Sequence, residues 1–187
     1  MIGSMLFVLG AVAGALAAIL AFRPLSFAAQ RPAEYAGTAP ALDPSRHLSG
    51  ALTVDGVIFG PFGRVTSRFN ADMQGSWDGA AGHLAESFRF AGGGRQERAW
   101  HLQLGEAGRV TATAEDVIGT ATGQASGATL VLRYRLRLGE AAGGHVLSVT
   151  DWMYLTEEGT IVNRSEMHKF GLPVATLLAT MRPAGDV

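Results

Sequence analysis

The chain contains no cysteine. It therefore has no disulfide framework, no thiol nucleophile and no cysteine-ligated metal site. Basic residues are not in surplus either, because 15 Lys and Arg stand against 16 Asp and Glu, for a formal net charge of -1. Proteins that neutralise nucleic-acid phosphates need a basic surplus, so we expect no nucleic-acid partner.

Familiar catalytic and metal-binding signatures are also missing. The sequence has no nucleophile elbow, no HExxH pair and no phosphate-cradling loop that opens a helix. Its histidines are scattered without the spacing of metal ligands, at His47, His83, His101, His145 and His168. We therefore expect neither a metal nor another cofactor.

No ionisable side chain occurs between Met1 and Phe22. A helix of that length would extend about 33 Å, enough to cross a hydrocarbon core of about 30 Å. A signal peptide normally opens with basic residues, which are absent here, so we favour a retained anchor over an export signal cleaved near residues 26–28. Gly10 and Gly14 form a small-xxx-small pair that could hold two such helices together in a homodimer.

Arg23 and Arg31 follow the apolar segment, and no basic residue precedes it. The positive-inside rule then favours a cytoplasmic position for the folded domain. Residues 23–42 contain Pro, Ala and Gly without periodicity, as in a tether. We divide the chain into an anchor over residues 1–22, a tether over 23–42 and a folded domain over 43–187.

A strict two-residue alternation runs from Arg64 to Asp78. Apolar or small residues occupy every second position, and polar residues stand between them. Because side chains alternate faces along a strand, the segment predicts a strand with one buried and one solvated face. Further strands are expected at residues 50–59, 83–91, 98–104, 109–116, 130–138, 145–155 and 160–170. Glycine-bearing turns separate them, so we predict an all-β fold: a closed antiparallel β-barrel of about eight to nine strands.

Two segments of this barrel remain open, one turn sets a register, and a short helix is expected before the first strand. Residues 119–127 have little apolar bulk and fit a loop or a weak strand, while residues 174–181 fit a last strand or a helix. The turn at residues 60–63 pairs Ile58 with Val65 if it is a type I turn. Asp43 and Pro44 resemble the N-cap and first position of a short helix.

Glu86 falls on the apolar face of its expected strand. If Ala91 pairs with Arg95 across the next turn, Glu86 faces Trp100 and lies diagonal to Arg98. A buried carboxylate without a partner would cost several kcal/mol or take up a proton. We therefore predict an inward ion pair between Glu86 and Arg98.

Barrels of about eight strands are either filled by side chains or hold one small ligand. Small inward residues such as Ser67, Ala71 and Gly75 leave volume unfilled, and Arg98 would meet a carboxylate or phosphate head group. The predicted ligand-binding residues are Phe69, Trp77, Glu86, Phe88, Phe90, Arg98, Trp100 and Tyr134. The alternative is a solid interior in which the aromatics pack and Arg98 neutralises Glu86.

Asp151, Glu166 and His168 are the candidates for acid/base chemistry, because a carboxylate near an imidazole can tune proton transfer near neutral pH. Glu166 and His168 lie on the same face of one expected strand, and Asp151 lies on the strand before it. The alternative is a solvated strand face with no catalytic part.

Five short sequence motifs resemble, in order and spacing, those of the bacterial family known as domain of unknown function 3833. The likeness covers about residues 48–181 and implies a lipocalin-like barrel without an established activity. Many relatives look like exported lipoproteins with a lipid-modified cysteine, which implies a periplasmic position, whereas this chain has an apolar segment instead. Relatives also tend to be encoded beside enzymes that modify fatty acyl chains. The motifs are Gly75-Ser76-Trp77-Asp78-Gly79, Asp116-Val117-Ile118-Gly119, Ala121-Thr122-Gly123, Asp151-Trp152-Met153-Tyr154-Leu155 and Asn163-Arg164-Ser165-Glu166-Met167-His168-Lys169-Phe170-Gly171.

We predict a single-pass protein of the bacterial inner membrane whose barrel binds or presents a lipid-like apolar ligand without catalysing a reaction. The first alternative is an enzyme or accessory subunit of fatty-acyl modification that uses Asp151, Glu166 or His168 as proton carriers. The second is a solid interaction module that offers only its outer surface.

Overall fold

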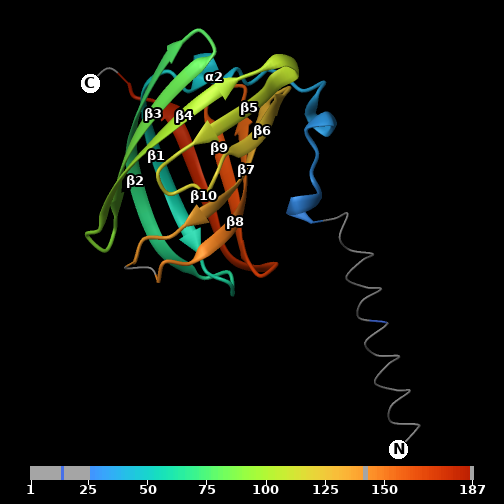
Figure 1. Ribbon diagram of the computed structural model, residues 1–187. Coiled ribbons are helices and arrows are strands. Elements are labelled where there is room, and N and C mark those ends of the chain that lie inside the picture. Colours follow the sequence, from blue (N-terminus) through green and yellow to red (C-terminus); the bar gives the residue numbers. More distant parts are fainter. Residues whose placement is uncertain (1–13, 15–25, 141–142, 186–187) are drawn as a thin grey trace, which may run out of the picture.

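The computed structural model describes residue 14, residues 26–140 and residues 143–185 (Figure 1). In these residues ten antiparallel strands close into one barrel, in the order β1-β10-β9-β8-β7-β6-β5-β4-β3-β2. The strands are β1 (Gly50–Phe59), β2 (Val65–Asp78), β3 (Ala81–Phe90), β4 (Arg95–Leu104), β5 (Arg109–Thr113), β6 (Ala121–Ser126), β7 (Thr129–Arg137), β8 (Val146–Leu155), β9 (Ile161–Lys169) and β10 (Leu172–Pro183). The predicted antiparallel barrel is confirmed, with ten strands in place of eight or nine.

The higher strand number comes from the segments that periodicity left open. β6 forms where apolar bulk is low, because its backbone lies close to β7: a Cβ on Gly123 would sit 1.9 Å from the carbonyl oxygen of Val131. A glycine is therefore required at that position. β10 pairs with both β9 and β1 and so closes the barrel.

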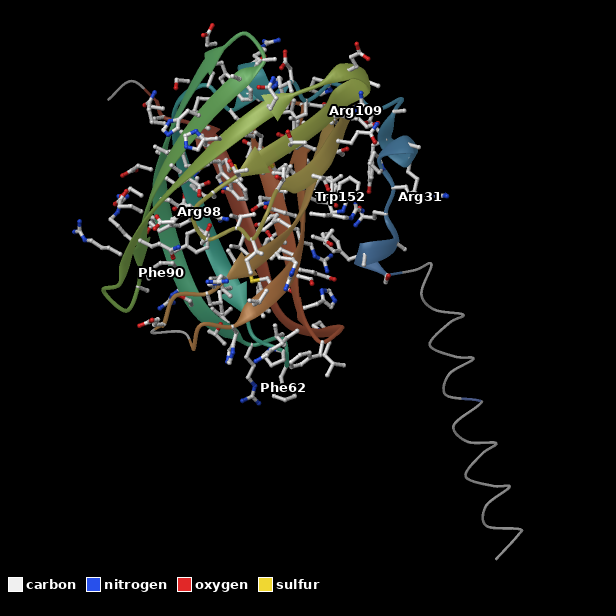
Figure 2. The ribbon with its side chains drawn as sticks, viewed as in Figure 1. Arg31, Phe62, Phe90, Arg98, Arg109 and Trp152 are labelled. Carbon is white, nitrogen blue, oxygen red and sulfur yellow. The ribbon has the colours of Figure 1, made fainter. Side chains whose placement is uncertain are left out.

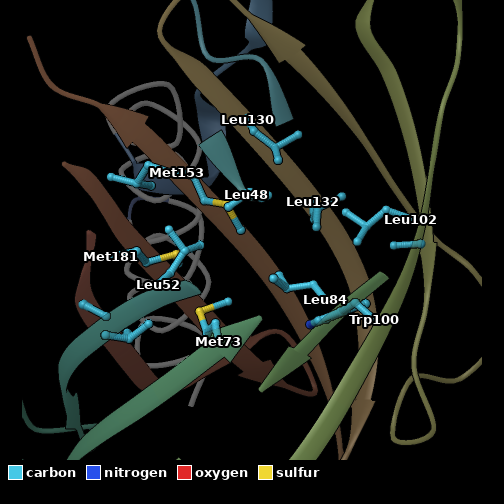
Figure 3. Close-up of a cluster of buried hydrophobic side chains, with 14 of the residues drawn as sticks. Leu48, Leu52, Met73, Leu84, Trp100, Leu102, Leu130, Leu132, Met153 and Met181 are labelled. Atoms are coloured by element: carbon cyan, nitrogen blue, oxygen red, sulfur yellow. The ribbon is translucent and has the colours of Figure 1, made fainter. Parts of the chain in front are cut away.

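The alternation in β2 sorts its side chains as predicted. Phe69, Ala71 and Met73 are buried, and the polar residues between them are exposed. The same sorting on the other strands fills the interior with leucine, methionine and tryptophan side chains that converge from opposite walls (Figure 3). Burial of this apolar face stabilises the barrel.

The predicted register at the first hairpin is wrong. Ile58 pairs with Ser67, and Phe59 pairs with Val65, so a β-bulge leaves Thr66 between the two pairs. A bulge places two residues of one strand opposite one residue of the other, which a simple type I turn does not provide.

One end of the barrel is covered by α2 (Pro44–His47) and the residue that follows it (Figure 1). Asp43 caps this helical turn as expected, since its side chain accepts a hydrogen bond of 2.9 Å from the Ser45 amide. Leu48 is buried, and its carbonyl oxygen accepts a 3.1 Å hydrogen bond from the Trp77 indole. A Cβ on Gly75 would lie 1.9 Å from that same oxygen, so only glycine allows the contact.

The segment before α2 lies along the outer wall of the barrel (Figure 1). It contains two short 3-10 helices, η2 (Phe27–Ala29) and η3 (Pro32–Tyr35). The Tyr35 ring packs 5.3 Å from that of Trp152 on β8, and the Leu42 amide donates a 2.8 Å hydrogen bond to the Gly127 carbonyl. Part of the expected tether therefore packs against the barrel, while the division into anchor, tether and domain stays a prediction.

Within the part of the chain that the structure describes, no helix has the length and apolarity needed to cross a membrane. The expected anchor over residues 1–22 lies outside the described residues except for Gly14, and so does its proposed contact residue Gly10. The anchor and its homodimer contact stay predictions.

Candidate functional site

Charged and polar side chains from four walls meet inside the barrel. Glu86 comes from β3, Arg98 from β4, Tyr134 from β7 and Asp151 from β8, and all four line one interior cavity of about 110 Å³. The rest of the lining is mostly apolar and includes four methionines: Met73, Met153, Met167 and Met181. The cavity is thus an apolar space with a polar cluster on one side.

Arg98 forms its ion pair with Asp116 and not with Glu86, so that part of the prediction is wrong. Arg89 pairs with Arg95, which places Glu86 directly opposite Arg98. The guanidinium instead lies over the Trp100 ring, 4.2 Å from its centroid, and its Nε is 3.0 Å from Oδ1 of Asp116. The cation-π contact holds the side chain toward the Asp116 loop.

The Arg98–Asp116 contact has ion-pair distance without hydrogen-bond geometry. Nε and Nη2 of Arg98, Oδ1 of Asp116 and Oε2 of Glu86 are all buried, and none has a hydrogen-bond partner among the described residues. Buried polar atoms are nearly always hydrogen-bonded, so this cluster is unusual in a folded interior.

Burial dominates the protonation of this cluster. It raises the pKa of Glu86 from 4.5 to about 7, although the Arg98 charge opposes the rise. Burial also raises the pKa of Asp151, against hydrogen bonds from Ser165 and Asn163. It places the pKa of Tyr134 well above 10. Glu86 therefore changes charge near neutral pH.

Asp151 is held by donors from two neighbouring strands. Ser165 on β9 donates a 2.7 Å hydrogen bond to its Oδ1, and Asn163 donates to the same oxygen. Tyr134 donates a longer bond of 3.4 Å to Oδ2. These donors fix the carboxyl group in the interior.

We expect Ser165→Ala to lower the free energy of unfolding by about 1–2 kcal/mol, because a buried carboxyl group loses one of its donors. Urea denaturation measures the change. Ser148→Ala is the matched control, since Ser148 on β8 is exposed. Equal effects of the two substitutions would contradict a role for Ser165 in holding Asp151.

The eight predicted ligand-binding residues divide between the cavity and its surroundings. Six line the cavity: Phe69, Glu86, Phe88, Arg98, Trp100 and Tyr134. Trp77 instead packs over Gly82 near the α2 end, and Phe90 stacks on Phe88 with ring centroids 6.2 Å apart.

The three candidates for acid/base chemistry are not brought together. Asp151 lies inside the barrel, while Glu166 and His168 belong to the opposite face of β9. There Glu166 contacts Arg164 at 2.9 Å and His168 at 4.0 Å. Because the barrel wall separates them, Asp151 does not share a site with the other two. Across the described residues, no group of three or more His, Asp and Glu is placed to hold a metal ion.

Sequence reasoning did not assign the residues that surround Asp151 and Arg98. Asn163 and Ser165 lie on the inward face of β9 together with Ile161. The alternation along this strand could therefore have predicted that both side chains point into the barrel. The strand expected over residues 109–116 ends at Thr113, so Asp116 belongs to the connection between β5 and β6 and its side-chain position did not follow from the alternation.

An outer groove of about 900 Å³ reaches the same cluster from outside the barrel. β4 pairs with β5 only from His101 to Leu104, so the wall beside the first half of β4 lacks strand pairing on that side. Arg98 and Asp116 border this groove, and Arg98 also lines the interior cavity. The Arg98 side chain thus connects the two spaces.

Solved structures with a similar fold have little sequence in common with this chain. One is the S-type phycobiliprotein lyase CPES from Guillardia theta, with a TM-score of 0.54, 6% identity, and coverage of 75% of this chain and 90% of that one. Another is Rv2717c from M. tuberculosis, with a TM-score of 0.53, 16% identity, and coverage of 79% and 99%. At these identities the similarity concerns the fold alone.

A comparison with curated proteins finds no match. The family model described as protein of unknown function DUF3833 matches residues 22–183, which is most of the sequence and includes every strand of the barrel. The chain therefore belongs to the DUF3833 family.

Proposed function

We propose that the barrel binds one small amphipathic, lipid-like molecule, with its polar head at Arg98 and Glu86. The observation that carries this proposal is the pair of unpartnered buried atoms, Oε2 of Glu86 and Nη2 of Arg98, in an otherwise apolar interior. An unsatisfied buried polar group costs about 1–3 kcal/mol. A carboxylate or phosphate oxygen could accept from Arg98 while protonated Glu86 donates to a second oxygen.

The apolar part of the ligand would occupy the methionine-lined space. At about 110 Å³ the cavity is smaller than typical ligand sites of about 300–1,000 Å³, so binding requires side chains to move. Methionine is unbranched and adapts to irregular partners, and four methionines line this cavity. The proposal therefore includes rearrangement of these side chains as the ligand enters.

The outer groove offers a route to the polar head site. It borders the Arg98–Asp116 pair, and the half of β4 that does not pair with β5 forms one of its sides. A ligand that reaches Arg98 from this groove would compete with Asp116 for the guanidinium. We also propose that the N-terminal segment tethers the barrel to the bacterial inner membrane, which raises the local concentration of a ligand dissolved there.

Ligand binding is tested on the full chain by native mass spectrometry and by titration with dansylated undecanoic acid. We expect a co-purified acyl lipid and saturable probe fluorescence in the unmodified protein. Ala179→Leu adds bulk at a buried, cavity-lining position and should abolish both signals. Ala51→Leu, on the exposed face of β1, is the matched control and should retain them.

Circular dichroism shows whether each variant keeps the barrel fold. The solid interaction module is the correct alternative if folded, unmodified protein carries no lipid and does not bind the probe. Binding should also weaken as the pH rises through about 7, since ionised Glu86 repels an anionic head group.

A further inference from the structure

Strongly exposed large apolar side chains gather at one end of the barrel. The described residues include five such side chains, and four of them come from two turns: Phe62 and Val65 near the β1–β2 turn, and Phe170 and Leu172 around the β9–β10 turn. Phe62 is 91% exposed and Phe170 is 93% exposed. We call these four residues the apolar rim.

The two turns of the apolar rim are neighbours. β1 pairs with β2 on one side and with β10 on the other, and Phe59 at the end of β1 lies opposite Thr176. Figure 2 shows Phe62 at the end of the barrel that lies away from Arg109. The rim is therefore one continuous edge at the end opposite α2.

Phe170 occupies a backbone conformation that bulky residues rarely adopt. Its φ is +53°, and Gly171 follows with φ +79°, so both central residues of this two-residue turn are left-handed. Such turns favour Asn-Gly, and a phenylalanine at the first position is an outlier. A strained, nearly fully exposed aromatic contributes nothing to the core, which indicates a role at the surface.

Cationic side chains flank the apolar rim. Arg64 precedes Val65, and Lys169 precedes Phe170 with its Nζ 5.6 Å from the phenylalanine ring. Arg95 begins β4 at the same end. Glu140 is the one acidic residue in the described parts of the β1–β2, β3–β4, β7–β8 and β9–β10 connections at this end. The β5–β6 connection adds Glu115 and Asp116, and Asp116 faces Arg98. The opposite end has acids at Asp78, which ends β2, and at Glu106, Glu157 and Glu158.

We propose that the apolar rim inserts into the surface of an anionic lipid bilayer, with Arg64 and Lys169 against the lipid phosphates. Aromatic side chains on protruding turns enter the interfacial layer, and flanking cations are attracted to anionic head groups. Two narrow turn tips suit insertion between lipids better than contact with a flat protein face, which needs a broad buried area. This contact is independent of any ligand inside the barrel.

The absence of cysteine makes a site-specific test direct. Phe62→Cys provides a single attachment point for the polarity-sensitive dye NBD, and Glu158→Cys provides the matched control at the opposite end. The full-length labelled chain is reconstituted into vesicles of phosphatidylcholine, with or without phosphatidylglycerol. NBD emission and quenching by nitroxide-labelled lipid are then recorded.

We expect a blue shift and quenching at position 62 in vesicles with phosphatidylglycerol, and no blue shift at position 158. Adding Arg64→Glu and Lys169→Glu to the Phe62→Cys chain should reduce both signals. A label at position 62 that stays as water-exposed as the control overturns the proposal. So does an equal blue shift without vesicles, which would identify a protein contact.

Discussion

Replacing Trp152 with alanine is expected to lower the free energy of unfolding by about 3–5 kcal/mol, the range for truncating a fully buried tryptophan. Trp152 has no exposed surface, yet it lies on the outward face of β8, since its neighbours Asp151 and Met153 line the interior. Its ring packs between those of Tyr35 and Tyr154, at 5.3 and 5.9 Å. The N-terminal segment therefore encloses a second, small core on the outer wall.

The same substitution should release the segment that covers Trp152. Gln30 accepts hydrogen bonds from Tyr35 and Tyr154, and the Arg164 guanidinium lies 4.2 Å from the centroid of the Phe27 ring. These contacts are partly exposed and depend on the tryptophan beneath them. Limited proteolysis should then cut within residues 26–42 of Trp152→Ala under conditions that leave the unmodified chain intact.

Urea denaturation provides the free-energy measurement, and Leu178→Ala is the control. Leu178 also lies on the outer wall, but it is exposed, so its truncation should change stability by less than about 0.5 kcal/mol. If Trp152→Ala behaves like Leu178→Ala and the segment resists cleavage, the outer core does not stabilise the protein.

The sequence pattern predicted strands wherever one face of the strand is buried and the other is exposed to solvent. β2 is the clearest case, because its alternation covers the whole strand. The sequence did not assign β6 firmly as a strand. Gly123 lies against a neighbouring backbone, and a position that requires glycine adds no apolar side chain to the pattern. The outer core around Trp152 was missed although Trp152, Met153 and Tyr154 form a continuous apolar run, which is typical of a strand covered on both faces.

The alternation of side chains along each strand also predicted much of the candidate site. It placed Glu86 and Arg98 inside because both fall among apolar residues on their strands. It could not predict the partner of Arg98, since Asp116 lies in an irregular connection whose position depends on tertiary contacts. Arg95 pairs with Arg89 and not with Ala91 as expected, a register shift of two residues. An even shift keeps each side chain on its face and changes only which residues are opposite, so faces were predicted better than pairs.

The second large effect concerns pH. Glu86 titrates near 4.5 in an unfolded chain, whereas burial raises its pKa to about 7 in the barrel. The folded protein thus binds the proton more tightly, and its stability falls as the pH rises from about 4.5 to 7. Glu86 then contributes a loss of about 3 kcal/mol, because each pKa unit corresponds to about 1.4 kcal/mol.

The groups that face Glu86 set the direction of this effect. Arg98 on β4 favours the ionised carboxylate, while Asp151 on β8 and Asp116 oppose it, and burial exceeds all three. Glu86→Gln removes the titration, so its advantage over the unmodified chain should grow by about 2.5 kcal/mol between pH 5 and pH 8. Urea denaturation at several pH values measures this difference. Glu158→Gln, at an exposed turn, controls for the loss of one negative charge. A Glu86→Gln advantage that stays constant with pH would mean that Glu86 is already ionised in the folded barrel and that another group satisfies its carboxylate.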